Sequence, residues 1–196
     1  MEEPIKKKPA LMPENAERVF RGKIFDIWQW EQKLYDGSIG TFERVSRPNT
    51  ANVIVVKDGK VLVQKQEQPD KAQVYYSLPG GRCDNGPDED PLTAAKRELL
   101  EETGLVSNDW TLWKEDAPFN KIIWTIYTFL ARDCRKEAEP RLDAGERIEN
   151  LWVDFDEFLK LGKEALFYDR ETLVAVGRMK ADKEEKERFR KLILGE

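Results

Sequence analysis

The sequence predicts an α/β sandwich, in which helices flank one sheet, preceded by a small antiparallel β unit. Short runs of β-branched and aromatic residues, separated by turn signals, are typical of strands, whereas residues 91–103 and the C-terminal segment carry helix signals. The chain has 196 residues, of which 40% are hydrophobic. This is enough for one globular domain and a smaller accessory part. We expect residues 1–48 to form the accessory part and residues 49–196 to form the main domain.

The N-terminal segment contains a leader and a hairpin. Residues 1–18 are polar, with three consecutive lysines at 6–8, and they lack the apolar core of a signal peptide. We expect a loose, solvated leader. Residues 23–48 read as strand, turn, strand, because Asp36 and Gly37 lie between runs of alternating aromatic and polar residues. A two-stranded hairpin is marginal alone, so it must pack on the main domain or on a second copy of the chain.

The main domain begins with a second hairpin. Residues 52–56 (NVIVV) and 61–66 (VLVQKQ) are joined by the turn KDGK. Their apolar runs predict central strands that are covered on both faces. Further strand-like runs follow at residues 110–116, 121–133 and 148–158.

Two segments are predicted to be helical. In the first, Asp90 is a suitable N-cap, Pro91 suits the first helical position and Gly104 suits the C-terminal end. The second, residues 169–196, mixes opposite charges at helix spacings. The apolar face of the first helix, which we expect to lie on the sheet, consists of Leu92, Ala95, Leu99 and Leu100.

The first helix also carries three glutamates. Glu98 and Glu102 are four residues apart and share one face, and Glu101 flanks them, so we expect an acidic patch on the protein surface. Carboxylates at this spacing repel one another, and a hard divalent cation such as Mg²⁺ would compensate for the repulsion. The preceding glycines have no side chain, so their backbone can approach the cation closely. The carbonyl group of Gly81 could then complete the coordination shell of the cation. The alternative is a solvated acidic surface balanced by the adjacent basic residues.

The composition excludes several mechanisms. The chain has no histidine, which excludes a Ser/His/Asp triad, a Cys/His pair and an imidazole metal site. Oxygen ligands suit Mg²⁺, Mn²⁺ or Ca²⁺. The modest net charge of −5 does not predict nucleic-acid binding. Only two cysteines, Cys83 and Cys134, and no apolar run of membrane-spanning length predict a reduced, cytoplasmic protein without a membrane partner.

The glutamate-rich helix carries a resemblance to a known family. Residues 97–105, RELLEETGL, resemble the second half of the Nudix box, R-E-U-x-E-E-x-G-U, in which U is a bulky aliphatic residue. Glu89 lies eight residues before Arg97, as the family pattern requires. The pattern also has a glycine where this chain has Cys83. Gly81 supplies this glycine if two extra residues are accommodated before the helix.

This resemblance implies a mixed-sheet α/β/α fold and an enzyme that hydrolyses nucleoside diphosphates linked to another group X, using Mg²⁺ or Mn²⁺. Arg97 would orient the glutamates by ion pairing, and Arg97 and Glu101 count among the catalytic residues. The resemblance assigns metal binding to Glu98, Glu101, Glu102 and Gly81, and structural support of the box to Glu89 and Gly104.

The same resemblance points to a general base outside the helix. Family members that cleave ADP-ribose and sugar nucleotides often take this base from an acidic loop beyond the box. Residues 141–158 are an acidic segment in which Glu146 matches that placement best, with Asp143 and Glu149 in reserve. The alternative is a solvated loop whose charges only raise solubility.

The N-terminal hairpin is similar to the strands that precede the box in ADP-ribose and sugar-nucleotide pyrophosphatases. In those enzymes the strands build a homodimer and lend aromatic residues to the partner's nucleotide site, so we expect a homodimer here. Trp28 and Trp30 share one strand face, where one could stack on the base, or both could serve packing. Arg44 and Arg47 are candidate contacts to the diphosphate.

The expected function is therefore hydrolysis of a nucleoside diphosphate sugar, such as ADP-ribose, to a nucleoside monophosphate and a sugar phosphate. The segment SLPGG at residues 77–81 departs from the ADP-ribose enzymes. It favours an alternative, a housecleaning hydrolase of nucleoside triphosphates or dinucleotide polyphosphates. A third hypothesis is a nucleotide-sugar-binding module without activity, which the mutually repelling glutamates argue against.

Overall fold

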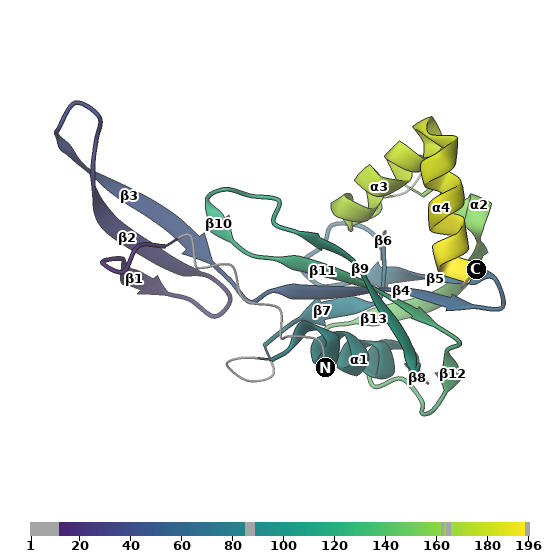
Figure 1. The fold of residues 1–196 in the computed structure, drawn as a ribbon. Coiled ribbons are helices and arrows are strands. Elements are labelled where there is room, and N and C mark those ends of the chain that lie inside the picture. The colour runs from purple at the N-terminus through teal and green to yellow at the C-terminus, as the bar shows by residue number, and fades with distance from the viewer. Residues whose placement is uncertain (1–11, 85–88, 162, 164–165, 195–196) are drawn as a thin grey trace. The chain divides into compact units, whose positions relative to one another are not determined.

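The computed structural model of the protein describes residues 12–84, 89–161, 163 and 166–194. Within them the chain forms the strands and helices labelled in Figure 1. Most of the predicted leader, including its three lysines, lies outside the described residues. None of the helices in this described part is long and apolar enough to cross a membrane.

The first of two compact units contains residues 1–49 and 117–125, and its sheet has the order β1-β2-β3-β10. β2 and β3 pair antiparallel along their whole length around a turn in which Gly37 has a φ of +86°, so the predicted hairpin is confirmed. β1 pairs with β2, and Arg18 binds Asp26 at 3.1 Å. The leader was expected to be loose up to residue 18. This expectation is wrong for Glu17 and Arg18, which belong to β1. The strands are β1 (Glu17–Arg21), β2 (Asp26–Lys33), β3 (Ile39–Ser46) and β10 (Ile122–Ile123).

The second unit, residues 50–116 and 126–196, contains a mixed sheet with the order β13-β5-β4-β11-β9. β4 and β5 form the predicted second hairpin, but they pair only beside the turn, at Val56↔Val61 and Lys57↔Lys60. Beyond that point β4 pairs with β11 and β7, whereas β5 pairs with β13 and β6. The short loop between β6 and β7 therefore connects the two diverging halves of the sheet. These strands are β4 (Thr50–Lys57), β5 (Lys60–Glu67), β6 (Tyr75–Ser77), β7 (Gly80–Arg82), β9 (Asp109–Asp116), β11 (Ile126–Arg132) and β13 (Arg147–Asp154).

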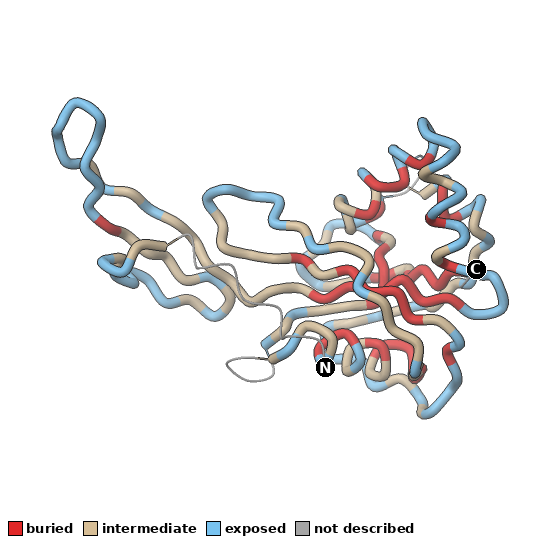
Figure 2. The backbone as a smooth tube through the Cα atoms, in the orientation of Figure 1, coloured by how far each residue is buried: buried red, intermediate tan, exposed pale blue. Residues whose placement is uncertain are grey.

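Helices cover both faces of this sheet. Alternate residues of β4 point to opposite sides: Val53 and Val55 pack with Leu99 of α1 (Pro91–Thr103), whereas Ile54 and Val56 belong to the core cluster formed with the other helices. Figure 1 shows α1 on one side and α2, α3 and α4 on the other. Figure 2 shows the buried segments concentrated in the central strands and on the helix sides that face them. The predicted α/β/α sandwich is confirmed.

The C-terminal part differs from the sequence prediction in one element. Residues 148–158 were expected to be a single strand, but β13 ends at Asp154 and α2 (Phe155–Phe158) follows. The turn of helix places Phe158, which is fully buried, in the core. The helical tail is confirmed as two helices, with Asp182 in an extended conformation between them. The remaining elements are α3 (Arg170–Ala181), α4 (Lys183–Leu194), β8 (Leu105–Val106) and β12 (Arg135–Lys136).

Candidate active site

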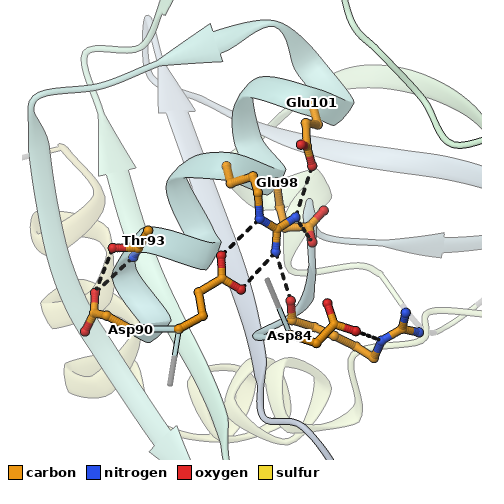
Figure 3. Close-up of polar contacts among 8 residues, drawn as sticks. Asp84, Asp90, Thr93, Glu98 and Glu101 are labelled. Atoms are coloured by element: carbon orange, nitrogen blue, oxygen red, sulfur yellow. Dashed lines mark hydrogen bonds and ion pairs between the residues drawn. The ribbon is translucent and has the colours of Figure 1, made fainter. Parts of the chain in front are cut away.

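Helix α1, which carries the candidate acids, begins and ends where the sequence predicts. The Oδ2 atom of Asp90 accepts hydrogen bonds from the backbone N–H of Thr93 at 3.0 Å and from its hydroxyl at 3.3 Å (Figure 3). Gly104 has a φ of +71° and donates its N–H to the Leu100 carbonyl at 2.8 Å. Both ends of the helix are fixed by local interactions, so the acids between them have a defined place.

Arg97 is the centre of an ion-pair network with Glu89, Glu98 and Glu101, of which the last two are labelled in Figure 3. Its guanidinium donates to both carboxylate oxygens of Glu89, at 3.1 and 3.2 Å, and the Glu89 side chain is only 3% exposed. The same group donates to Glu98 at 2.7 Å, to Glu101 at 3.0 Å and to the Arg82 carbonyl at 3.0 Å. The hydrogen bonds to Glu89 are the main cause that raises the pKa of Arg97. Arg97 therefore joins the helix to the strand β7 and to the segment before α1.

Glu102 lies in the interior, so the expectation that all three glutamates form a surface patch is wrong for this residue. It is 5% exposed. One of its oxygens, Oε2, accepts hydrogen bonds from the N–H of Gly80 at 3.0 Å and from the side chain of Gln64 at 3.1 Å. Burial, and then the charge of Glu98, raise the pKa of Glu102 well above its ordinary value.

Glu98 lies directly against Gly81 of β7. A Cβ atom at position 81 would overlap with the Glu98 carboxylate, so this close approach requires glycine. Burial is the main cause that raises the pKa of Glu98. Gly81 pairs with Ala51 of β4, which fixes the backbone beside the carboxylate.

The position at which the chain departs from the box pattern is not a reactive one. Cys83 is half-buried, and burial raises the pKa of its thiol to about 12. The thiol therefore stays protonated near neutral pH and supplies no nucleophile. Residues 85–88, which make up most of the segment expected to absorb the two extra residues, lie outside the described part of the chain.

Glu146, the candidate base, lies in the turn that leads into β13. Its Oε2 atom accepts a hydrogen bond from the backbone N–H of Asp143 at 3.2 Å. Burial, and then the charges of Asp143 and Glu101, raise the pKa of Glu146. The charge of Glu146 in turn contributes to the raised pKa of Glu98 and Glu102. Glu146 is thus close enough to the acids of α1 to interact with each of them.

The two reserve candidates lie in different surroundings. Glu149 is exposed on β13 and forms an ion pair with Lys65 at 3.3 Å. Asp143 is exposed, and its backbone rather than its carboxylate contacts Glu146. Neither is partly buried as Glu146 is.

The donor chemistry of these acids fits a hard divalent cation. Among the described residues, no three acidic side chains are already gathered as a metal cluster, and Arg97 binds two of the candidate ligands, Glu98 and Glu101. Burial and mutual repulsion nevertheless raise the pKa of Glu98 and Glu102, so an added positive charge would keep both carboxylates ionised. Glu98, Glu101 and Glu102, with the Gly81 carbonyl, could hold Mg²⁺ or Mn²⁺.

The two tryptophans predicted to contact a base lie in the first unit, on β2. Trp30 is 8% exposed, and its ring contacts Phe42 and the guanidinium of Arg44, whose carbon lies 5.6 Å from the ring centre. Trp28 is half-buried and donates its indole N–H to the Ser46 hydroxyl at 2.8 Å. These contacts give Trp30 a packing role within its own unit, and leave Trp28 the more accessible of the two.

The two predicted arginines differ in their contacts. The guanidinium of Arg47 lies over Trp124, 4.4 Å from the ring centre. Two buried nitrogens of Arg44, Nε and Nη1, have no hydrogen-bond partner within the described residues. Arg44 lines a shallow recess of about 400 Å³ that also contains Lys121 and Glu43. Unsatisfied guanidinium nitrogens beside a lysine suit an anionic ligand.

The neutral polar residues that hold Glu102 were not predicted from the sequence. Gln64 and Gln66 are buried on β5, and the Asn150 side chain donates to the Glu102 carbonyl at 3.1 Å. The available signal was the pair of glutamines in a strand predicted to be covered on both faces, because buried polar side chains need partners.

Gly81→Ala is expected to lower turnover about 10²-fold, because the added methyl group displaces the Glu98 carboxylate and a misplacement of about 1 Å can have this effect. The free energy of unfolding should change by less than about 1 kcal/mol, since the end of a flexible side chain can move aside. Steady-state kinetics and thermal unfolding check both parts. Gly177→Ala, where an added methyl group meets no atom within 4 Å, is the control. Wild-type turnover in Gly81→Ala would contradict the placement of Glu98.

Comparison with known proteins agrees with this geometry. The family model of the NUDIX domain matches residues 46–173. The ADP-ribose pyrophosphatase of Bacillus subtilis (strain 168) is 30% identical over 165 residues, which cover 82% of this chain and 87% of that protein. The methanol dehydrogenase activator of Bacillus methanolicus is 28% identical over 166 residues, which cover 82% of this chain and 88% of that protein.

The fold is also shared with a solved structure. The crystal structure of an ADP compounds hydrolase superposes with a TM-score of 0.69 at 20% identity, covering 86% of this chain and 91% of that one. The NUDIX match spans most of the sequence and includes α1 with its ion-pair network. On these grounds the chain belongs to the Nudix family of hydrolases.

Proposed function

We propose that the protein hydrolyses the diphosphate bond of a nucleoside diphosphate sugar, with ADP-ribose as the first candidate, in a reaction that depends on Mg²⁺ or Mn²⁺. The observation that carries the proposal is the position of Glu102, buried beside Glu98 and Gly80 with Glu146 close enough to interact. Carboxylates held in this way, with raised pKa values, are typical of a site that receives a cation and a phosphate group.

The residues of the site have separate tasks in the proposed reaction. A bound Mg²⁺ or Mn²⁺ would neutralise the diphosphate and lower the pKa of a water molecule. Glu98, Glu101 and Glu102 would hold the cation, and Arg97, which pairs with the first two, would keep them in place. Glu146 accepts the proton of the attacking water, for which its raised pKa is suitable. The water oxygen bonds to one phosphorus atom and the bridging P–O bond breaks, giving a nucleoside monophosphate and a sugar phosphate.

The first unit would bind substrate and a second copy of the chain. The recess beside Arg44 and Lys121 offers positive charge for a diphosphate or a sugar phosphate. A homodimer through the N-terminal strands would cover the exposed apolar side chains of this unit. They include Val19, Phe20, Phe25 and Ile39, each between 45% and 68% exposed. Cys83 and Cys134 are both free thiols, consistent with the proposed reducing, cytoplasmic location.

The choice of substrate has one serious competitor. The similarity to an ADP-ribose pyrophosphatase over most of both chains favours ADP-ribose. The segment SLPGG, whose last two residues contact Glu102 and Glu98, favours nucleoside triphosphates or dinucleotide polyphosphates. A binding module without activity is disfavoured, because such a protein gains nothing from burying repelling carboxylates.

A substrate panel separates these hypotheses. The purified protein would be incubated with Mg²⁺ and, in turn, ADP-ribose, UDP- and GDP-sugars, nucleoside triphosphates and diadenosine polyphosphates, and the products separated by chromatography. We expect a nucleoside monophosphate and a sugar phosphate, and no product when a chelator is present. Turnover confined to triphosphates or dinucleotides would establish the competitor, and binding without turnover would establish the binding module.

Glu146→Gln is expected to lower turnover about 10²- to 10⁴-fold, because a general base contributes this much to a proton transfer. Metal affinity should change little, since Glu146 is not one of the proposed ligands. Asp143→Asn and Glu149→Gln are matched controls that remove a charge from the same segment, and both should keep turnover near the wild-type value. A larger loss in either control than in Glu146→Gln would transfer the role of base to that residue.

A further inference from the structure

A chain of buried polar side chains crosses strands β5 and β6 and ends on Glu102. The hydroxyl of Tyr75 donates to the side-chain carbonyl of Gln66 at 2.8 Å. The Gln66 amide nitrogen donates to the Gln64 side-chain carbonyl at 2.7 Å, and the Gln64 nitrogen donates to Glu102 Oε2 at 3.1 Å. All four residues are buried, with Gln64 completely so.

The direction of these hydrogen bonds is determined by the two residues at the ends of the series, Glu102 and Tyr75. An ionised carboxylate only accepts, so Gln64 must turn its nitrogen toward Glu102 and its carbonyl toward Gln66. Gln66 then uses its nitrogen for Gln64 and for the Ser77 hydroxyl at 2.8 Å, which leaves its carbonyl for Tyr75. Burial raises the pKa of Tyr75 above its ordinary value, so the hydroxyl keeps its proton and remains a donor.

The Tyr75 hydroxyl is the donor that satisfies the buried carbonyl of Gln66, so its removal leaves this oxygen unpaired and weakens the preference for the observed orientation of the Gln66 amide. A carboxamide has a donor end and an acceptor end of nearly the same shape, and it can rotate by 180° in the same space. Rotation of Gln66 would turn its carbonyl toward the carbonyl of Gln64. Gln64 would then either face that oxygen with its own carbonyl or rotate its nitrogen away from Glu102 and from the Asn150 side-chain oxygen, to which it donates at 3.1 and 3.3 Å. Buried networks of this kind depend on every member being satisfied.

The two donors to Glu102 act on the same oxygen. Gly80 and Gln64 both donate to Oε2, and among the described residues Oε1 accepts no hydrogen bond. This arrangement fixes the plane of the carboxylate and keeps Oε1 free to bind a cation.

We infer that Tyr75, acting through Gln66 and Gln64, is a positioning residue that holds the Glu102 carboxylate in its metal-binding orientation. The inference rests on the proposed role of Glu102 as a metal ligand. Groups that orient a metal ligand by hydrogen bonding typically change metal affinity by about 10- to 100-fold when they are removed.

Tyr75→Phe tests this inference, because it removes only the hydroxyl and keeps the ring, whose centre lies 5.2 Å from that of Tyr168. Mn²⁺ affinity would be measured by the electron paramagnetic resonance signal of free Mn²⁺, far below the unfolding temperature of each variant. We expect the Mn²⁺ dissociation constant to rise about tenfold in Tyr75→Phe and further in Gln64→Met, which interrupts the chain next to Glu102. Turnover of Tyr75→Phe should be lowest at limiting Mg²⁺ and recover as Mg²⁺ is raised, a pattern that a loss of folded protein would not give.

Two control variants keep the outcomes distinct. Tyr76→Phe removes a hydroxyl from the neighbouring residue of β6, which packs against the core on the side of α2–α4, and its Mn²⁺ affinity should stay within twofold of wild type. Glu102→Gln should lose most of the Mn²⁺ affinity. An unchanged affinity in Tyr75→Phe, with the expected loss in Glu102→Gln, would overturn the inference and leave the proposed function intact. Unchanged affinity in Glu102→Gln would instead overturn the metal site itself.

Discussion

Glu102→Gln is expected to lower turnover by at least about 10³-fold, which corresponds to about 4 kcal/mol of transition-state stabilisation. Glutamine preserves the shape of the side chain but removes the charge that would bind the cation. Its oxygen can still accept the hydrogen bonds that Gly80 and Gln64 donate to Glu102. The measurement is the turnover number at saturating substrate and Mg²⁺.

The same substitution should not destabilise the protein when metal is absent. Burial raises the pKa of Glu102 well above its ordinary value, so the ionised carboxylate opposes folding near neutral pH and its removal relieves this cost. In a chelator, the unfolding temperature of Glu102→Gln should equal or exceed that of the wild type. Glu115→Gln, which changes an exposed residue of β9, is the control and should keep full turnover. Retention of more than a tenth of the wild-type turnover in Glu102→Gln would contradict the account of this residue.

Arg97→Gln is expected to lower the free energy of unfolding by about 3 kcal/mol, because it removes the guanidinium that forms a bidentate ion pair with a buried carboxylate. The Glu89 side chain is 3% exposed, and its two carboxylate oxygens accept hydrogen bonds from Arg97. Arg97→Lys should recover only part of the stability, since a lysine cannot form the same two parallel hydrogen bonds. Denaturant unfolding followed by intrinsic fluorescence measures the effect.

The double variant Arg97→Gln/Glu89→Gln distinguishes charge from packing. Removing both partners leaves no unpaired buried charge, so most of the lost stability should return. Turnover should remain low, because Glu98 and Glu101 would still lack the guanidinium that holds them. If Glu89→Gln restores no stability in the Arg97→Gln background, the ion pair is not the cause of the loss.

The parts of the fold that depend on neighbouring residues were predictable from the sequence. Asp90 and Gly104 define α1 through hydrogen bonds within one turn, and the turn at Gly37 defines the first hairpin. The opposite sides of β4 were both recognisable as buried. Each of these features follows from local geometry and hydrophobic pattern.

Features that depend on distant contacts were not predictable in the same way. Helical spacing places Glu98 and Glu102 on one face, but only the packing of α1 against β5 and β7 buries Glu102. In the same way, the hairpin pattern could not reveal that β10, 76 residues beyond the end of β3, would pair with it, because parallel pairing has no turn signal. The series of hydrogen bonds from Tyr75 to Glu102 likewise forms only because β5, β6 and α1 come together in the fold.

Phosphorus nuclear magnetic resonance of ADP-ribose, incubated with the wild-type protein and Mg²⁺, tests the proposed hydrolysis most directly. We expect the diphosphate signals to disappear and to be replaced by two phosphomonoester signals, of AMP and ribose 5-phosphate, and we expect a chelator to prevent this change. Diphosphate signals that persist with both Mg²⁺ and Mn²⁺, or hydrolysis that continues in the chelator, would contradict the proposed reaction.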